Sequence, residues 1–82
     1  MIYEKSGLQS LANLKVGQTA RVAEITATGS MRRRLLDLGV ISGTNIECLQ
    51  KNPAGDPVAY NIRGAVIALR TEDSKDILVS VI

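Results

Sequence analysis

Three consecutive arginines are the sharpest local feature of this sequence. Arg32, Arg33 and Arg34 lie in a segment whose pattern predicts a helix. Successive helix residues point about 100° apart, so these side chains form a basic belt around the exposed side of the helix. A solvated helix face is the simpler interpretation of such a belt. The functional interpretation is a docking surface for an acidic partner, because arginine is favoured at protein interfaces.

A small acidic cluster lies near the end of the chain, at Glu72, Asp73 and Asp76. Carboxylate oxygens are ligands for hard divalent ions, so Asp73 and Asp76 are weak candidates for loose metal binding. The alternative, which the pattern favours, is a set of charges at the start of a short helix that faces water.

The other residue types in the chain argue against catalysis. The chain has no histidine and a single cysteine, Cys48, whereas closed transition-metal sites need several imidazole or thiolate ligands. Cys48 alternates with Ile46, which predicts an inert thiol inside the core; a ligand or redox role is the alternative. We find no poised acid–base pair and no phosphate-binding glycine motif. We therefore expect no catalytic residue, no cofactor and no enzymatic activity.

Length and composition predict a single domain over residues 1–82 with an aliphatic core. Hydrophobic residues make up 45% of the chain, and Tyr3 and Tyr60 are its two aromatic residues. The net charge of +2 and the scarcity of aromatics disfavour nucleic-acid binding. One cysteine cannot form an internal disulfide, and no uncharged stretch approaches the length of about 20 residues that a membrane helix needs. Residues 1–5 do not resemble a signal segment, so we expect a cytoplasmic protein without membrane insertion.

Frequent turn residues divide the chain into short elements. Alternation of apolar residues predicts five strands, over residues 18–27, 45–50, 58–62, 65–70 and 77–81, with a bulge or bend at Glu24 and Ile25. Arg63 and Gly64 predict a tight turn.

Three helical segments are expected between these strands. The spacing of Leu8, Leu11 and Leu14 predicts one or two helical turns. A helix over residues 30–38 is expected to begin at Ser30 as N-cap and to end at Gly39. Its apolar stripe is Met31, Leu35 and Leu38, and Arg33 is placed to pair with Asp37. Thr71 is expected to cap a single turn over residues 71–74.

Five short strands have edges that must be hidden, and a small barrel hides them at least cost. The predicted fold class is therefore mostly β, a small SH3-like barrel of about five strands with two short helices. An unpaired edge strand at residues 77–81 would offer a route to weak self-association.

Several segments, taken in order, resemble the FeoA family, the small cytosolic partners of bacterial ferrous iron transport. They are residues 14–22, 33–44, 56–59, 63–64 and 68–70, and the resemblance extends over about residues 11–81. One departure is Ala65, where the family pattern leads us to expect a bulkier residue.

The resemblance implies a non-enzymatic accessory role beside a membrane ferrous iron transporter with a cytosolic GTP-binding domain (FeoB-like), on which the module would dock. Two alternatives stay open. The first is a metal-responsive regulatory domain related to the C-terminal domain of iron- and manganese-dependent repressors, acting through Asp73 and Asp76. The second is a nucleic-acid-binding small barrel, which the low charge disfavours.

Overall fold

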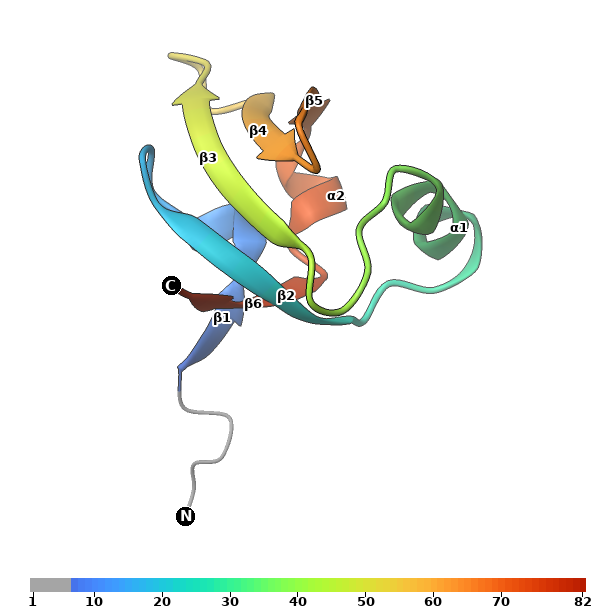
Figure 1. Ribbon diagram of the computed structural model, residues 1–82. Helices are drawn as coiled ribbons and strands as arrows, with labels where there is room; N and C mark the ends of the chain where they lie inside the picture. The colour runs from blue at the N-terminus through green and yellow to red at the C-terminus, as the bar shows by residue number, and fades with distance from the viewer. Residues whose placement is uncertain (1–6) are drawn as a thin grey trace.

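A computed structural model describes residues 7–82 as one antiparallel sheet with short helices packed against it (Figure 1). The six strands lie in the order β1-β6-β2-β3-β4-β5. In chain order, the elements are β1 (Leu8–Ser10), the 3₁₀ helix η1 (Leu11–Asn13), β2 (Thr19–Ile25), α1 (Gly29–Asp37), β3 (Asn45–Lys51), β4 (Val58–Ile62), β5 (Ala65–Leu69), α2 (Thr71–Ser74) and β6 (Ile77–Val81). The prediction for residues 1–5 lies outside the described residues.

The mostly-β prediction is confirmed, whereas the strand count and the closed barrel are not. The unpredicted strand is β1, where Leu8 pairs with Ser80 and Ser10 pairs with Leu78. The predicted helical turn is present as η1 over Leu11–Asn13, but Leu8 lies outside it. Ser10 ends the strand, and its hydroxyl accepts a hydrogen bond from Ala12 N–H, which caps η1. The sheet is open within residues 7–82, with β1 and β5 at its edges.

The prediction that residues 77–81 form an edge strand is wrong. Strand β6 lies between β1 and β2, with Val79 opposite both Gln9 and Val22. The last strand in the chain is therefore in the interior of the sheet, and its backbone is not free to pair with a second copy. The edge strand on the other side of the sheet is β5.

Two local features predicted from the sequence, a bulge in β2 and a tight turn after β4, are present in the sheet. The register of β2 against β6 shifts between Val22 and Glu24, next to the predicted bulge. The tight turn between β4 and β5 is confirmed, because Arg63 and Gly64 both have positive φ, at 54° and 88°. Such a two-residue turn matches the twist of the strands and sets Ile62 opposite Ala65.

Helix α1 ends as predicted but begins earlier. Its N-cap is Thr28 rather than Ser30, and the Thr28 side chain makes no capping hydrogen bond. At the other end, Gly39 has a φ of 93°. The N–H groups of Gly39 and Val40 donate to the carbonyls of Leu36 and Leu35, a Schellman motif that stops the helix.

The core is aliphatic, as predicted, and it connects the sheet with α1. The predicted stripe on α1 is confirmed, since Leu35 is fully buried and Met31 and Leu38 pack partly buried against the core. Cys48 is also fully buried, as is Tyr60 but for 1% of its surface. No helix within residues 7–82 is long and apolar enough to cross a membrane.

Candidate docking surface on helix α1

The three arginines of α1 lie on a helix that stands at the side of the sheet (Figure 1). All three side chains are exposed. The belt predicted from the sequence is therefore present. The contacts of the three guanidinium groups nevertheless differ, and these contacts decide which arginine is available to a partner.

Arg32 and Arg34 attach the helix to the body of the protein. Nη1 of Arg32 donates a hydrogen bond to the carbonyl of Ile25 at the end of β2, at 3.0 Å. Nη1 of Arg34 lies 3.3 Å from Oδ1 of Asp73, which belongs to α2. Each of these arginines connects α1 to a different element, so both have a structural role that the sequence did not reveal.

Arg33 is the arginine that remains for a partner. Within residues 7–82 it forms no ion pair, and the predicted pairing with Asp37 is absent. A free guanidinium group on an exposed helix is a suitable contact for a carboxylate of another protein. The predicted docking surface is thus reduced from three equivalent arginines to one.

Two exposed apolar side chains lie beside the arginines, and the sequence analysis did not single them out. Leu36 is 39% exposed and Ile41 is 45% exposed. They line a hollow of about 440 Å³ between α1 and the end of β2, and the other residues that line it are Glu24, Ile25, Arg32 and Ser42. The sequence did contain a signal for this exposed residue, because Leu36 is apolar but falls outside the apolar stripe of α1. Exposed apolar side chains beside polar and charged ones are typical of a protein-binding surface.

The acidic cluster does not face water as a unit. Asp73 is 4% exposed, and its Oδ2 accepts a hydrogen bond from the backbone N–H of Arg70 at 3.2 Å. Arg70, rather than the predicted Thr71, is therefore the N-cap of α2. With the Arg34 ion pair, both carboxylate oxygens of Asp73 already have partners.

The candidate metal ligands are accordingly not assembled into a site in the described part of the chain. Asp76 is half-buried, and its backbone carbonyl accepts a hydrogen bond from Thr26 N–H at 2.8 Å. Across residues 7–82, no three His, Cys, Asp or Glu side chains come together as metal ligands would.

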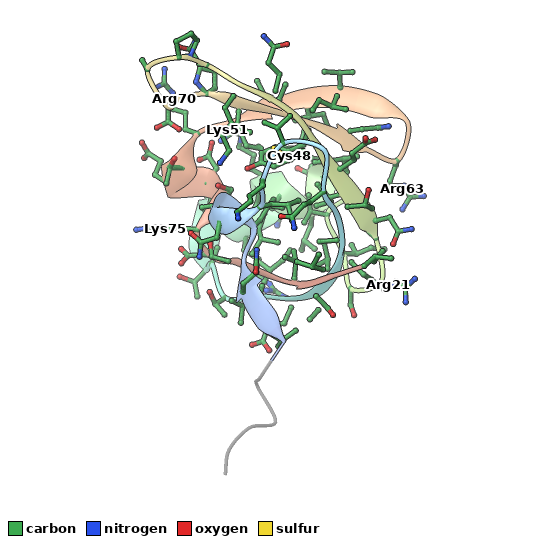
Figure 2. The ribbon with its side chains drawn as sticks, turned by 90° about the vertical axis from the view of Figure 1, so that its left-hand side faces the viewer. Arg21, Cys48, Lys51, Arg63, Arg70 and Lys75 are labelled. Atoms are coloured by element: carbon green, nitrogen blue, oxygen red, sulfur yellow. The ribbon has the colours of Figure 1, made fainter. Side chains whose placement is uncertain are left out.

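Cys48 lies inside the core, as predicted from its alternation with Ile46 (Figure 2). Burial raises the pKa of its thiol above the ordinary value, because the thiolate would lose its hydration. A protonated, enclosed thiol is a poor nucleophile and a poor metal ligand.

The family model described as the FeoA domain matches residues 9–81. The chain belongs to the FeoA family. The resemblance noted in the sequence is thereby confirmed over its whole predicted extent, about residues 11–81.

Relatives at the sequence and structure levels agree with this assignment. The chain is 35% identical over 72 residues to an Fe(2+) transport protein A/Fe(2+) transporter FeoB fusion protein from Porphyromonas gingivalis, covering 88% of this chain and 8% of that protein. A FeoA-like protein from Clostridium acetobutylicum has a TM-score of 0.87 and 34% identity, over 94% of this chain and 90% of the other. FeoA of Stenotrophomonas maltophilia, described as an SH3 domain protein and complexed with zinc, has a TM-score of 0.77 and 26% identity, over 88% and 89% of the two chains.

The same fold occurs in transcriptional repressors. A manganese-dependent repressor complexed with manganese has a TM-score of 0.84 and 22% identity, and the match covers 92% of this FeoA-family chain and 37% of the repressor. The predicted relationship with repressor domains is therefore present in the fold.

Proposed function

We propose that this chain is a non-enzymatic accessory module of ferrous iron uptake, which docks in the cytoplasm on the GTP-binding part of a FeoB-like membrane transporter. The observation that carries the proposal is the relative from Porphyromonas gingivalis, in which a region similar to this chain is fused to the transporter itself. Fusion in one chain holds the module close to the transporter. A separate module that serves the same transporter must reach that position by binding to it.

The docking surface in this proposal consists of Arg33, Leu36 and Ile41. Leu36 and Ile41 supply exposed apolar area, and Arg33 supplies an unpaired positive charge beside it. This composition fits a partner surface with an apolar side chain that contacts Leu36 and Ile41 and a carboxylate that reaches Arg33. The charge contributes mainly to the rate of association and to orientation, so binding should weaken as salt concentration rises.

Two features support a role without catalysis or a resident cofactor. The sequence offers no histidine, and its one cysteine is enclosed in the core. The buried carboxylate that looked most like a metal ligand is held by Arg34 and by the N-terminus of α2. What remains for a partner to recognise is the surface of the domain.

The structure determines which variant tests this proposal. Reversing all three arginines would also break both contacts that hold α1 in place, so a loss of binding would have two explanations. Arg33→Glu changes the free arginine alone. Lys15→Glu is the matched control, because Lys15 is exposed and belongs to the loop between η1 and β2. That loop lies on the opposite side of Figure 1 from α1.

The measurement is calorimetric titration of each purified variant into the cytosolic part of the FeoB-like transporter. We expect Arg33→Glu to weaken binding by about fivefold, as for loss and reversal of an exposed ion pair, and Lys15→Glu to leave it unchanged. Wild-type affinity for Arg33→Glu with an unchanged fold would remove α1 from the interface. No binding by the wild-type chain would refute the docking proposal itself.

A further inference from the structure

Strand β5 is an open edge of the sheet, and its composition does not protect it. Its five residues, Ala65–Leu69, carry no charge and no proline. Val66 is 71% exposed. Edge strands of soluble proteins usually carry a charged residue, a proline or a bulge that prevents pairing with other chains. An unprotected edge with an exposed apolar side chain suits the addition of another strand.

The register shows which backbone groups of β5 are free. The tight turn places Ile62 opposite Ala65, and a two-residue turn is closed by a hydrogen-bonded pair of residues. Bonded and non-bonded pairs alternate along an antiparallel ladder. Ala65, Ile67 and Leu69 therefore bond to β4, whereas Val66 and Ala68 direct their N–H and C=O groups away from the sheet.

Two hollows lie on either side of the edge at Ala68. One, of about 440 Å³, is bounded by the helices through Met31, Arg34 and Glu72. The other, of about 260 Å³, lies on the outer face of the sheet beside Gln50 and Ala59. Side chains of a strand alternate between the two faces of a sheet. An added strand would thus have space for consecutive side chains on both faces.

Two unpaired arginines mark the ends of this edge and indicate the charge of the occupant. Arg63 and Arg70 are exposed and lie at opposite ends of β5 (Figure 2). Neither forms an ion pair within residues 7–82. Two copies paired antiparallel about Ile67 would bring Arg63 of one chain close to Arg70 of the other, which like charges oppose. The edge is better matched to a strand with acidic ends than to its own copy.

We infer that β5 accepts an extended segment of another protein, with acidic residues at both ends and uncharged residues between them, as an additional antiparallel strand. The backbone groups of Val66 and Ala68 bind the segment, and Arg63 and Arg70 select its charge. The inference goes beyond the proposed function, because it does not depend on the α1 surface.

The probe is a synthetic eight-residue peptide with glutamate at each end and alternating valine and threonine between them; a second peptide has lysine at each end. Binding is followed through the amide resonances of the isotope-labelled chain. We expect the acidic peptide to shift the Val66 and Ala68 amides and to bind about tenfold more tightly than the basic one. No shift in β5 at millimolar acidic peptide, or equal binding of both peptides, would overturn the inference.

Two variants separate strand addition from a general attraction of charges. Ala68→Pro removes an outward N–H that β4 does not use, and we expect it to abolish binding, whereas Ala68→Ser keeps the N–H and should bind normally. Should Ala68→Pro fail to fold, Arg70→Glu is the second variant, and it should abolish the preference between the two peptides, because Arg63 still favours the acidic peptide at the other end of β5. Wild-type binding by Ala68→Pro, or dimerisation of the chain that Ala68→Pro prevents, would rule out the acidic segment as the occupant.

Discussion

The side chain of Arg63 packs against the backbone of Gly39, so the turn between β4 and β5 supports the end of α1. A Cβ added at Gly39 would lie 2.8 Å from Cδ of Arg63, closer than carbon atoms can approach without a shift. Gly39 also has a φ of 93°, a conformation that residues with a Cβ rarely adopt. Because of both facts, we expect even one added methyl group at Gly39 to lower the stability of the fold.

The substitution Gly39→Ala should therefore destabilise the protein by about 1–2 kcal/mol from backbone strain, and by up to about 1 kcal/mol more because Arg63 must move. Gly43→Ala is the matched control, since Gly43 has a φ of 91° and no atom within 4 Å of the added Cβ. Urea unfolding measures both losses. Equal losses, or a difference that persists when Arg63→Ala is added to each, would show that the contact has no energetic weight.

The three arginines of α1 should differ in their contribution to stability. Arg32→Ala and Arg34→Ala each remove a contact between α1 and the body, and we expect each to lower the free energy of unfolding by about 0.5–1 kcal/mol. Arg33→Ala should change it by less than about 0.5 kcal/mol, because Arg33 forms no ion pair within residues 7–82. Thermal unfolding of the three variants checks this order, and an equal cost for all three would contradict it.

Asp73 should be the charged residue with the largest effect on stability among those discussed. Asp73→Ala removes the side chain that bonds back to the N-cap of α2 and leaves the N–H of Arg70 without its acceptor, so we expect a loss of about 1–2 kcal/mol. Asp73→Asn retains an acceptor oxygen and loses only the charge, so its cost should be smaller. Chemical denaturation at low and at high salt separates the contribution of the hydrogen bond from the salt-dependent contribution of the charge. Equal losses for both variants would assign the whole effect to the Arg34 ion pair.

Stability should fall at alkaline pH because of two buried acids. Burial raises the pKa of Cys48 and of Tyr60 above their ordinary values, so both groups hold their protons more tightly in the folded chain. Each group therefore makes its full contribution to the free energy of unfolding below its pKa in the unfolded chain, about 8.5 for the thiol and about 10 for the phenol. The free energy of unfolding falls as pH rises further.

Replacement of the thiol tests this directly. Cys48→Ala removes the first ionisation, so its stability should decline less than that of the wild type between about pH 8 and 10, although the cavity lowers its stability at every pH. Urea unfolding over that range provides the slopes. Parallel slopes, or rapid alkylation of Cys48 in the folded wild type near neutral pH, would contradict a buried and protonated thiol.

Much of this domain was predictable because its signals are local. Strands β4 and β6 occur where alternation placed them, and Gly39 and Gly64 occupy turns that only positive φ allows. The first strand was missed because its three residues have no period of their own and because Leu8, Leu11 and Leu14 imitate a helix. The cap of α2 was misassigned by one residue, since Arg70 does not resemble a capping residue and acts through its backbone.

The amino-acid sequence by itself determined the aliphatic core, the tight turn at Arg63 and Gly64 and the basic helix, because each follows from residue type or from neighbours along the chain. Only the tertiary structure decided that β6 lies inside the sheet and β5 at its edge, and that Arg32 and Arg34 hold α1 while Arg33 has no ion pair in the described part of the chain. Those outcomes depend on pairings such as Leu8 with Ser80 and Arg34 with Asp73. Residues so distant in sequence meet only after the sheet has formed, and no periodicity encodes which of them will meet.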